Sequence, residues 1–127
     1  MRPPLVLVVD DVVAIVEELL TLMRLHKIPA AGALDLNGAI QTLVREPDIR
    51  LISCDVRLDR GSGPDIIGLI KRHSALRHRD LQFLFVTGDP VVLEQNKDGD
   101  RLLMLSKPVQ PTTLISTIKN MLGVEHA

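Results

Sequence analysis

The chain has 127 residues, 46% of them hydrophobic, and a formal net charge of −1, which together suit one folded domain and exclude a disordered chain. The near-neutral charge gives no basis for direct nucleic-acid binding, and a chain with two Phe and no Tyr or Trp lacks a base-stacking surface. One cysteine excludes an internal disulfide, and no apolar run approaches the ~20 residues of a membrane helix, so we expect a cytoplasmic protein with no membrane contact.

Strand-like and helix-like segments alternate along the whole chain. Continuous aliphatic runs suit strands that are covered on both faces, and apolar residues at helical spacing follow them. In chain order we expect a strand at Leu5–Val9, a helix at Val12–His26, a weak strand at 29–34, a helix at 35–46, a strand at Leu51–Cys54, a Gly-rich loop at Arg60–Gly63, a helix from Pro64, a strand at Leu81–Val86, a short helix at Pro90–Lys97, a strand at Leu102–Leu105 and a helix from Pro111.

Proline and short polar residues mark several of the helix ends. Pro64 and Pro111 suit the first position of a helix, where no backbone N–H is needed. Asp35 or Asn37 can cap the helix that follows the second strand. Five strand–helix units with short connections predict an α/β protein with a parallel sheet between two layers of helices. We expect a (βα)5 three-layer sandwich of the flavodoxin-like type, a type in which the sheet order is 2-1-3-4-5.

Polar residues collect at the ends of the predicted strands. Asp10 and Asp11 follow the first strand, Asp55 follows the third, Thr87 the fourth and Lys107 the fifth. Ligands of open α/β sheets bind beyond the carboxyl ends of the strands. Because the first and third strands are neighbours in the expected order, the three carboxylates should share one edge of the sheet.

Three carboxylates at one edge repel each other, so one of them takes up a proton or a cation neutralises the set. Oxygen ligands favour a hard cation such as Mg²⁺. A carboxylate nucleophile, a divalent metal, an ammonium group and a hydroxyl together suit phosphoryl transfer. Each residue alone has a simpler interpretation, since Asp11 can cap the first helix and Asp55 can be a turn residue.

The combination closely resembles the receiver domain of two-component response regulators, as in the single-domain chemotaxis regulators. The residues of the resemblance are the acidic pair of Val8-Val9-Asp10-Asp11, Asp55 after Leu51-Ile-Ser-Cys54, Thr87-Gly88, Lys107-Pro108, and Gly63 eight positions beyond Asp55. It extends from Leu5 to about Leu122, and we expect residues 1–127 to form one such receiver domain.

The resemblance implies a role for each residue. Asp55 would be the phosphoacceptor, taking a phosphoryl group from a histidine of a sensor kinase or a histidine phosphotransfer protein. Thr87 and Lys107 would hold the phosphoryl oxygens. The protein would be a signalling module, not an enzyme, working as a monomer or a weak homodimer. Phosphorylation would alter a partner surface formed by the fourth helix, the fifth strand and the last helix.

The resemblance also implies a Mg²⁺ site. Asp11 and Asp55 would bind the ion through their side chains, Arg57 through its backbone carbonyl, and Asp10 through water. The position three residues before Lys107, usually Phe or Tyr in the family, is Met104 here. That departure keeps a second interpretation open, a receiver-like interaction module that works without phosphorylation.

A third interpretation is an aspartate-nucleophile phosphatase. Enzymes of this kind are similar in carrying a D-x-D motif after their first strand. The corresponding residues around the candidate nucleophile here, Asp55-Val56-Arg57, lack the second Asp. A separate hypothesis concerns the residues two positions beyond Asp55 and Thr87, which are Arg57 and Asp89. We expect these two side chains to approach each other, partly cover the site and slow the attack of water on the acyl phosphate.

Two other features receive plain structural interpretations. We expect Cys54 to behave as a small buried hydrophobe, not as a redox sensor. We expect the basic cluster from Lys71 to Arg79 to be a solvated helix end and loop, not a surface for an acidic partner.

Overall fold

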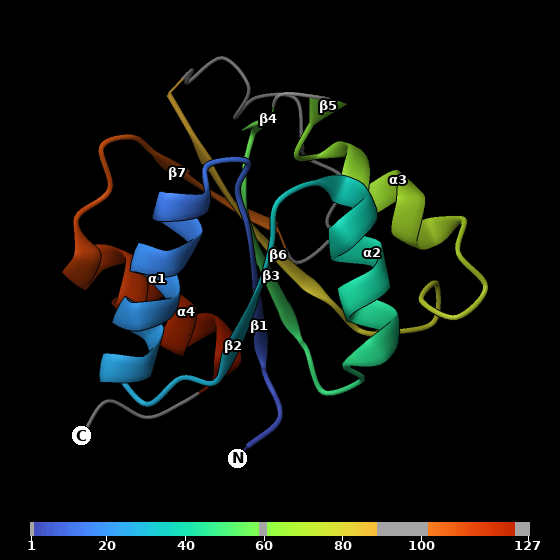
Figure 1. Ribbon diagram of the computed structural model, residues 1–127, viewed down its shortest axis with the longest axis horizontal. Helices are drawn as coiled ribbons and strands as arrows, with labels where there is room; N and C mark the ends of the chain where they lie inside the picture. The colour runs from blue at the N-terminus through green and yellow to red at the C-terminus, as the bar shows by residue number, and fades with distance from the viewer. Residues whose placement is uncertain (1, 59–60, 89–101, 124–127) are drawn as a thin grey trace.

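Five parallel strands form the centre of the molecule in a computed structural model that describes residues 2–58, 61–88 and 102–123 (Figure 1). The sheet order is β2-β1-β3-β6-β7, which confirms the predicted order 2-1-3-4-5. The strands are β1 (Val6–Val9), β2 (Ala30–Ala33), β3 (Leu51–Asp55), β6 (Gln82–Thr87) and β7 (Leu102–Ser106).

Helices cover both faces of this sheet. The described helices are α1 (Val13–Leu25), α2 (Leu36–Arg45), α3 (Asp65–Lys71) and α4 (Pro111–Leu122). Helices α1 and α4 lie on one face and α2 and α3 on the other, which makes the three-layer α/β sandwich that the sequence predicts (Figure 1). In the described part of the chain, no helix has the length and apolar character needed to cross a membrane. The expected helix at Pro90–Lys97 lies outside the described residues.

Side chains of the central strands alternate between two apolar cores. Leu7 and Val9 of β1 belong to the core under α2 and α3, whereas Val6 and Val8 belong to the core under α1 and α4. All four β1 side chains are buried, as expected for a continuous aliphatic run in a sheet covered on both faces. Gly32 of β2 lets α1 come close, because a Cβ there would lie 2.5 Å from Val16 Cγ1.

The predicted helix ends are close to the observed ones. Asp35 caps α2, its Oδ1 accepting a 2.7 Å hydrogen bond from the backbone N–H of Gly38. Pro111 is the first residue of α4, as predicted. Pro64 is the N-cap of α3 and not its first residue, a shift of one position at a boundary where the proline already has helical dihedral angles.

A small hairpin replaces part of the expected Gly-rich loop. Strands β4 (Arg57–Leu58) and β5 (Gly61–Ser62) pair antiparallel directly after β3. Two-residue strands are too short to show a hydrophobic period, so the sequence does not reveal them. Gly61 has a φ of +128°, a conformation that side chains rarely allow.

The interpretation of the basic cluster from Lys71 to Arg79 as a solvated helix end and loop is wrong at Arg79. Its guanidinium donates hydrogen bonds to the backbone carbonyls of Leu43, Glu46 and Ile49, and the bond to Ile49 measures 2.8 Å. These carbonyls lie at the end of α2 and in the loop before β3. Arg79 therefore serves as a structural tie, and burial lowers the pKa of its guanidinium.

Candidate functional site

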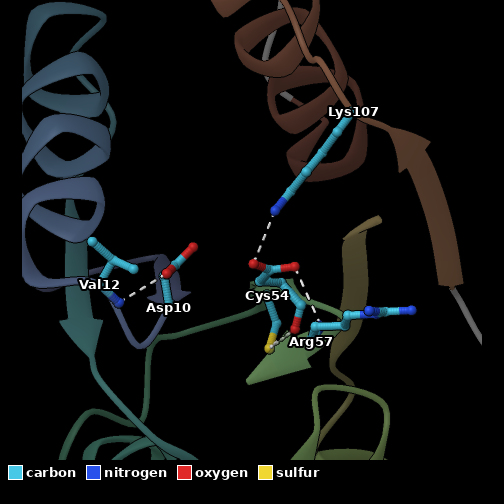
Figure 2. Close-up of polar contacts among 6 residues, drawn as sticks. Asp10, Val12, Cys54, Arg57 and Lys107 are labelled. Atoms are coloured by element: carbon cyan, nitrogen blue, oxygen red, sulfur yellow. Dashed lines mark hydrogen bonds and ion pairs between the residues drawn. The ribbon is translucent and has the colours of Figure 1, made fainter. Parts of the chain in front are cut away.

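The structure brings Asp55 and Lys107 into contact at the carboxyl edge of the sheet. Asp55 is the last residue of β3, and Lys107 directly follows β7. Lys107 Nζ lies 3.0 Å from Asp55 Oδ2 and forms an ion pair with it, drawn as the dashed line from Lys107 in Figure 2. The Asp55 side chain is 14% exposed and the Lys107 side chain 46%. A mostly covered carboxylate thus faces a half-exposed ammonium group.

Strand pairing fixes the position of Lys107. The backbone N–H of Lys107 donates a 2.8 Å hydrogen bond to the carbonyl of Thr87, which continues the β6–β7 ladder one residue beyond β7. Thr87 is the last residue of β6 and its side chain is buried. Because β6 also pairs with β3, the chain brings Thr87 and Lys107 to the edge where Asp55 lies.

The second oxygen of Asp55 is held from the other side. Oδ1 accepts a hydrogen bond of 3.3 Å from the backbone N–H of Arg57, the first residue of the hairpin. The Arg57 guanidinium points away from this carboxylate (Figure 2). The carboxylate is therefore oriented by an N–H donor at one oxygen and by an ammonium group at the other.

The acidic pair after β1 interacts with Asp55. Asp10 is 6% exposed, and its Oδ1 accepts a 2.9 Å hydrogen bond from the backbone N–H of Val12 (Figure 2). Burial raises the pKa of Asp10, and the negative charges of Asp55 and Asp11 raise it further, against the opposing effect of the Val12 hydrogen bond. The three carboxylates thus form one electrostatic group. The N-cap residue of α1 is Val12, so the capping interpretation of Asp11 is wrong.

Two cavities open beside Asp55. One has a volume of about 410 Å³ and is lined by Asp55, Arg57, Gly88 and Lys107. The other, of about 600 Å³, lies on the side of α1 and α4. Its polar lining includes Asp10, Asp55 and Lys107, and its aliphatic lining includes Ile15, Leu19, Val109 and Leu114. Asp55 and Lys107 line both cavities, so the carboxylate is accessible from two directions.

Gly63 packs directly against the backbone of the candidate phosphoacceptor. A Cβ at this position would lie 2.2 Å from the carbonyl oxygen of Asp55 and 2.9 Å from Cys54 Sγ. The backbone N–H of Gly63 donates a 2.7 Å hydrogen bond to the carbonyl of Val56. Only a residue without a side chain fits here, which gives a physical reason for a glycine that the sequence marked only by resemblance.

Cys54 fits the interpretation as a small buried hydrophobe. It is 1% exposed, and its Sγ donates a hydrogen bond of 3.2 Å to the carbonyl of Asp55. Burial, together with the charges of Asp55 and Asp10, raises the pKa of the thiol to about 12. The thiolate needed for redox chemistry is therefore strongly disfavoured at neutral pH.

The donor set at this edge fits a hard divalent cation. Asp10, Asp11 and Asp55 concentrate negative charge that a cation would relieve. Among the described residues, no three His, Cys, Asp or Glu side chains form a ready-made metal-binding group. Mg²⁺ does not need one, because it usually keeps several waters and takes one or two carboxylates from the protein.

Exposed apolar residues lie on one side of the site, at the start of α1, and were not anticipated. Val12, Val13 and Ile15, at the start of α1, are 46%, 52% and 37% exposed. The signal that could have revealed them is the apolar sequence Val12-Val13-Ala14-Ile15, which directly follows the acidic pair. Asp89 lies outside the described residues, so its predicted approach to Arg57 stays a prediction.

Comparisons with known proteins identify the family and the fold of this chain. The family model described as "Response regulator receiver domain" matches residues 6–119. A search of curated proteins finds no match. Many solved structures are similar, and three of them are described below.

A response regulator receiver protein from Pseudomonas putida is 28% identical, with a TM-score of 0.77, over 94% of this chain and 98% of that chain. The receiver domain of the PhyR response regulator from Erythrobacter litoralis is 26% identical, with a TM-score of 0.74, over 100% of this chain and 95% of that chain. The chemotaxis response regulator CheY4 of Vibrio cholerae is 21% identical, with a TM-score of 0.77 over 94% and 99%, a likeness of fold alone. The family model covers most of the chain, and the chain therefore belongs to the response regulator receiver domain family.

Proposed function

We propose that this protein is a two-component response regulator receiver whose Asp55 accepts a phosphoryl group from a phosphohistidine. The donor would be a sensor histidine kinase or a histidine phosphotransfer protein. The observation that supports this most is the Asp55–Lys107 ion pair, 3.0 Å long, at the opening of the 410 Å³ cavity. A nucleophilic carboxylate there has a cation beside it and space for a phosphoryl group.

The proposed step transfers one phosphoryl group between two nucleophiles. A carboxylate oxygen of Asp55 forms a P–O bond while the P–N bond to the donor histidine breaks, and that electron pair returns to the imidazole nitrogen. Lys107 would move from the carboxylate to the incoming phosphoryl oxygens, for which its half-exposed side chain has freedom. The Thr87 hydroxyl would donate to another phosphoryl oxygen. The Arg57 N–H would continue to orient Asp55.

We propose that Mg²⁺ binds at the acidic group. Asp11 and Asp55 would bind it by side chain, Arg57 by its backbone carbonyl and Asp10 through water. A bound Mg²⁺ would neutralise negative charge on the phosphoryl oxygens. The environment of Asp10 supports this, because burial and then the charges of Asp55 and Asp11 raise its pKa, and a nearby cation would favour its charged form.

A protein donor suits the surface around Asp55 better than a small molecule alone. Val12, Val13 and Ile15 are exposed beside the 600 Å³ cavity, and exposed apolar groups of this kind mark protein contacts. We propose that the donor covers these residues when its phosphohistidine reaches Asp55. The output partner is unidentified and would use the surface of β7 and α4, where Leu103 is 42% exposed. The expected helix at Pro90–Lys97, which would complete that surface, lies outside the described residues.

The remaining features of the proposal follow from the family. Receiver domains are typically signalling modules and not classical enzymes. We propose that residues 1–127 form one receiver domain that acts in the cytoplasm, as a monomer or weak homodimer, without binding nucleic acid or membrane. Met104 is half-buried and packs against the core under α2 and α3. It would have to move on phosphorylation if it replaces the usual aromatic switch residue.

Intact-mass measurement tests the proposal. The protein is incubated with acetyl phosphate or phosphoramidate, with Mg²⁺ or with EDTA, and one added phosphoryl group is expected with Mg²⁺ only. Asp55→Asn should lose it, whereas Asp48→Asn, an exposed aspartate in the loop before β3, should keep it. A chain that stays unmodified under all conditions would favour the phosphorylation-independent module. Steady turnover of a phosphomonoester would favour the phosphatase.

A further inference from the structure

A third cavity lies at the edge of the sheet opposite to Asp55. It has a volume of about 750 Å³ and is formed by the end of α1, the start of β2 and the segment before β1. Ala30, which lines it, pairs with Val6 at the amino end of β1, whereas Asp55 is at the carboxyl end of β3. In Figure 1 the end of α1 and the start of β2 lie far from the β4–β5 hairpin. The cavity is therefore separate from the candidate phosphoacceptor site.

Three cationic side chains line this cavity against one carboxylate. The cations are Arg2, Arg24 and Lys27, and the carboxylate is Glu46. Arg2 Nη2 donates a hydrogen bond of 3.4 Å to the backbone carbonyl of Lys27, which keeps the guanidinium at the turn after α1. The cavity thus combines an excess of positive charge with donors that suit a carboxylate or a phosphate.

The rest of the lining is aliphatic. Leu20, Ile28 and Pro29 contribute to it together with the small side chains at the start of β2. None of the described residues that line the cavity is aromatic, so a nucleobase would find no stacking partner among them. An apolar surface next to a cluster of cations favours a ligand with an aliphatic body and an anionic end.

We propose that this cavity binds an aliphatic organic anion, such as a medium-chain carboxylate. The hydrocarbon chain would lie on Leu20, Ile28 and Pro29, and the carboxylate would lie among the three cations. The cavity volume falls within the roughly 300–1,000 Å³ of small-molecule sites.

The helix dipole explains only part of this positive charge. Arg24 is the basic residue in the last turn of α1, and α2, α3 and α4 carry Arg45, Lys71 and Lys119 at equivalent places. Arg2 and Lys27 lie outside any helix. Lys27 also has a φ of 61°, a left-handed conformation for which glycine is the favourable residue. A lysine there is unfavourable for the backbone, which agrees with a role for its side chain.

Backbone-amide NMR of the ¹⁵N-labelled protein tests the proposal, with sodium decanoate added below its micelle concentration. We expect saturable shifts of the amides of Lys27, Ile28, Ala30 and Ala31. Arg24→Gln and Lys27→Gly should each weaken binding by about two- to fivefold, the usual loss when one partner of an exposed ion pair is removed. Arg45→Gln removes the last-turn cation of α2, outside the cavity lining, and should leave binding unchanged.

Lys27→Gly separates binding from folding. Because glycine suits the left-handed conformation, this variant should keep or raise the melting temperature while it loses decanoate binding. Asp55→Asn should bind decanoate normally, whatever its effect on phosphorylation. The proposal is overturned if decanoate causes no saturable shifts, if decyltrimethylammonium or decanol binds as tightly as decanoate, or if Arg45→Gln weakens binding as much as Arg24→Gln.

Discussion

At the scale of single residues, Asp10 is held in an unfavourable electrostatic position. Its carboxylate is buried beside two other acids, and these neighbours, together with burial, raise its pKa. A raised pKa means that the folded state binds the proton more tightly than the unfolded state does. The charged form of Asp10 therefore costs stability at neutral pH, as is common where residues are placed for a reaction and not for folding.

Asp10→Asn should therefore stabilise the metal-free protein at neutral pH, by about 1 kcal/mol. The amide oxygen can still accept the hydrogen bond from Val12. In the wild type, protonated Asp10 does not carry this cost, so the stability is fully present below the unfolded pKa of about 3.9. The wild type loses this stability as the pH rises through the raised folded pKa of Asp10. Melting curves of both proteins with EDTA should thus diverge as the pH rises above about 4. A variant that is less stable at pH 7, or a gap independent of pH, would contradict this account of the site.

Lys107→Gln should separate function from stability. The Lys107 side chain is half-exposed, so loss of its ion pair with Asp55 should change the free energy of unfolding by less than about 1 kcal/mol. The phosphorylation rate with acetyl phosphate should fall by at least about tenfold, because a cation that stabilises the phosphoryl oxygens is lost. Lys107→Arg keeps the charge and should retain more activity. Equal rates for the wild type and Lys107→Gln would show that Lys107 has no part in the reaction.

The convergence of these residues could be predicted from the sequence because parallel strands end at one edge. Asp55 and Lys107 are 52 positions apart, yet their places at strand ends predict that both lie at the carboxyl end of the sheet. The contact between Asp55 Oδ1 and the Arg57 N–H could not be predicted, because it depends on a two-residue strand with no pattern of its own. The identity of the α1 N-cap is also not evident from Asp10-Asp11-Val12, where two acids precede the helix and neither is the cap.

At the scale of elements, the β4–β5 hairpin turns the chain back onto Asp55. Gly63 follows the hairpin and packs on the end of β3. The hairpin thus connects the backbone of Asp55, the N–H that orients its side chain and the start of α3 in one compact turn. A substitution in this turn would change the geometry of the site without touching its charged groups.

Gly63→Ala should destabilise the protein by about 1–3 kcal/mol, the usual cost of forcing extra atoms into a packed position. The new Cβ would lie 2.2 Å from a backbone oxygen, which cannot move aside as a flexible side chain would. Gly88→Ala is the matched control for stability, since a Cβ there meets no atom of the described residues within 4 Å. Urea unfolding of the three proteins measures the difference. If Gly63→Ala is as stable as Gly88→Ala, the close packing on Asp55 is not real.

Helices and strands were predictable where the hydrophobic pattern extends over many residues. The role of a residue was not predictable where it depends on tertiary contacts. The apolar spacing of α1 and α4 and the aliphatic run of β1 are sufficient to predict these elements. The role of Arg79 is not predictable, because the carbonyls that it binds are 30 or more positions away in the chain. A basic cluster in a sequence does not show which member is partly buried and binds backbone carbonyls.

At the scale of the whole molecule, the cavities at both ends of the sheet are lined by charged residues of both signs, but the acidic group lies at one end only. Three carboxylates gather at the carboxyl edge, and three cations line the cavity at the other edge. The net charge of −1 conceals this separation, since it sums both ends. Alternation of strands and helices predicts the layers of the sandwich but not its strand order, for which the resemblance to receiver domains was needed.

The account depends most on Asp55 being the residue that carries the phosphoryl group. Borohydride reduces an acyl phosphate to an alcohol and converts the modified aspartate to homoserine, which peptide mass spectrometry can locate. After incubation with acetyl phosphate and Mg²⁺, we expect homoserine at position 55 only, and none after incubation with EDTA. Homoserine at position 10 or 11, or at no position although the protein remains folded, would contradict the account.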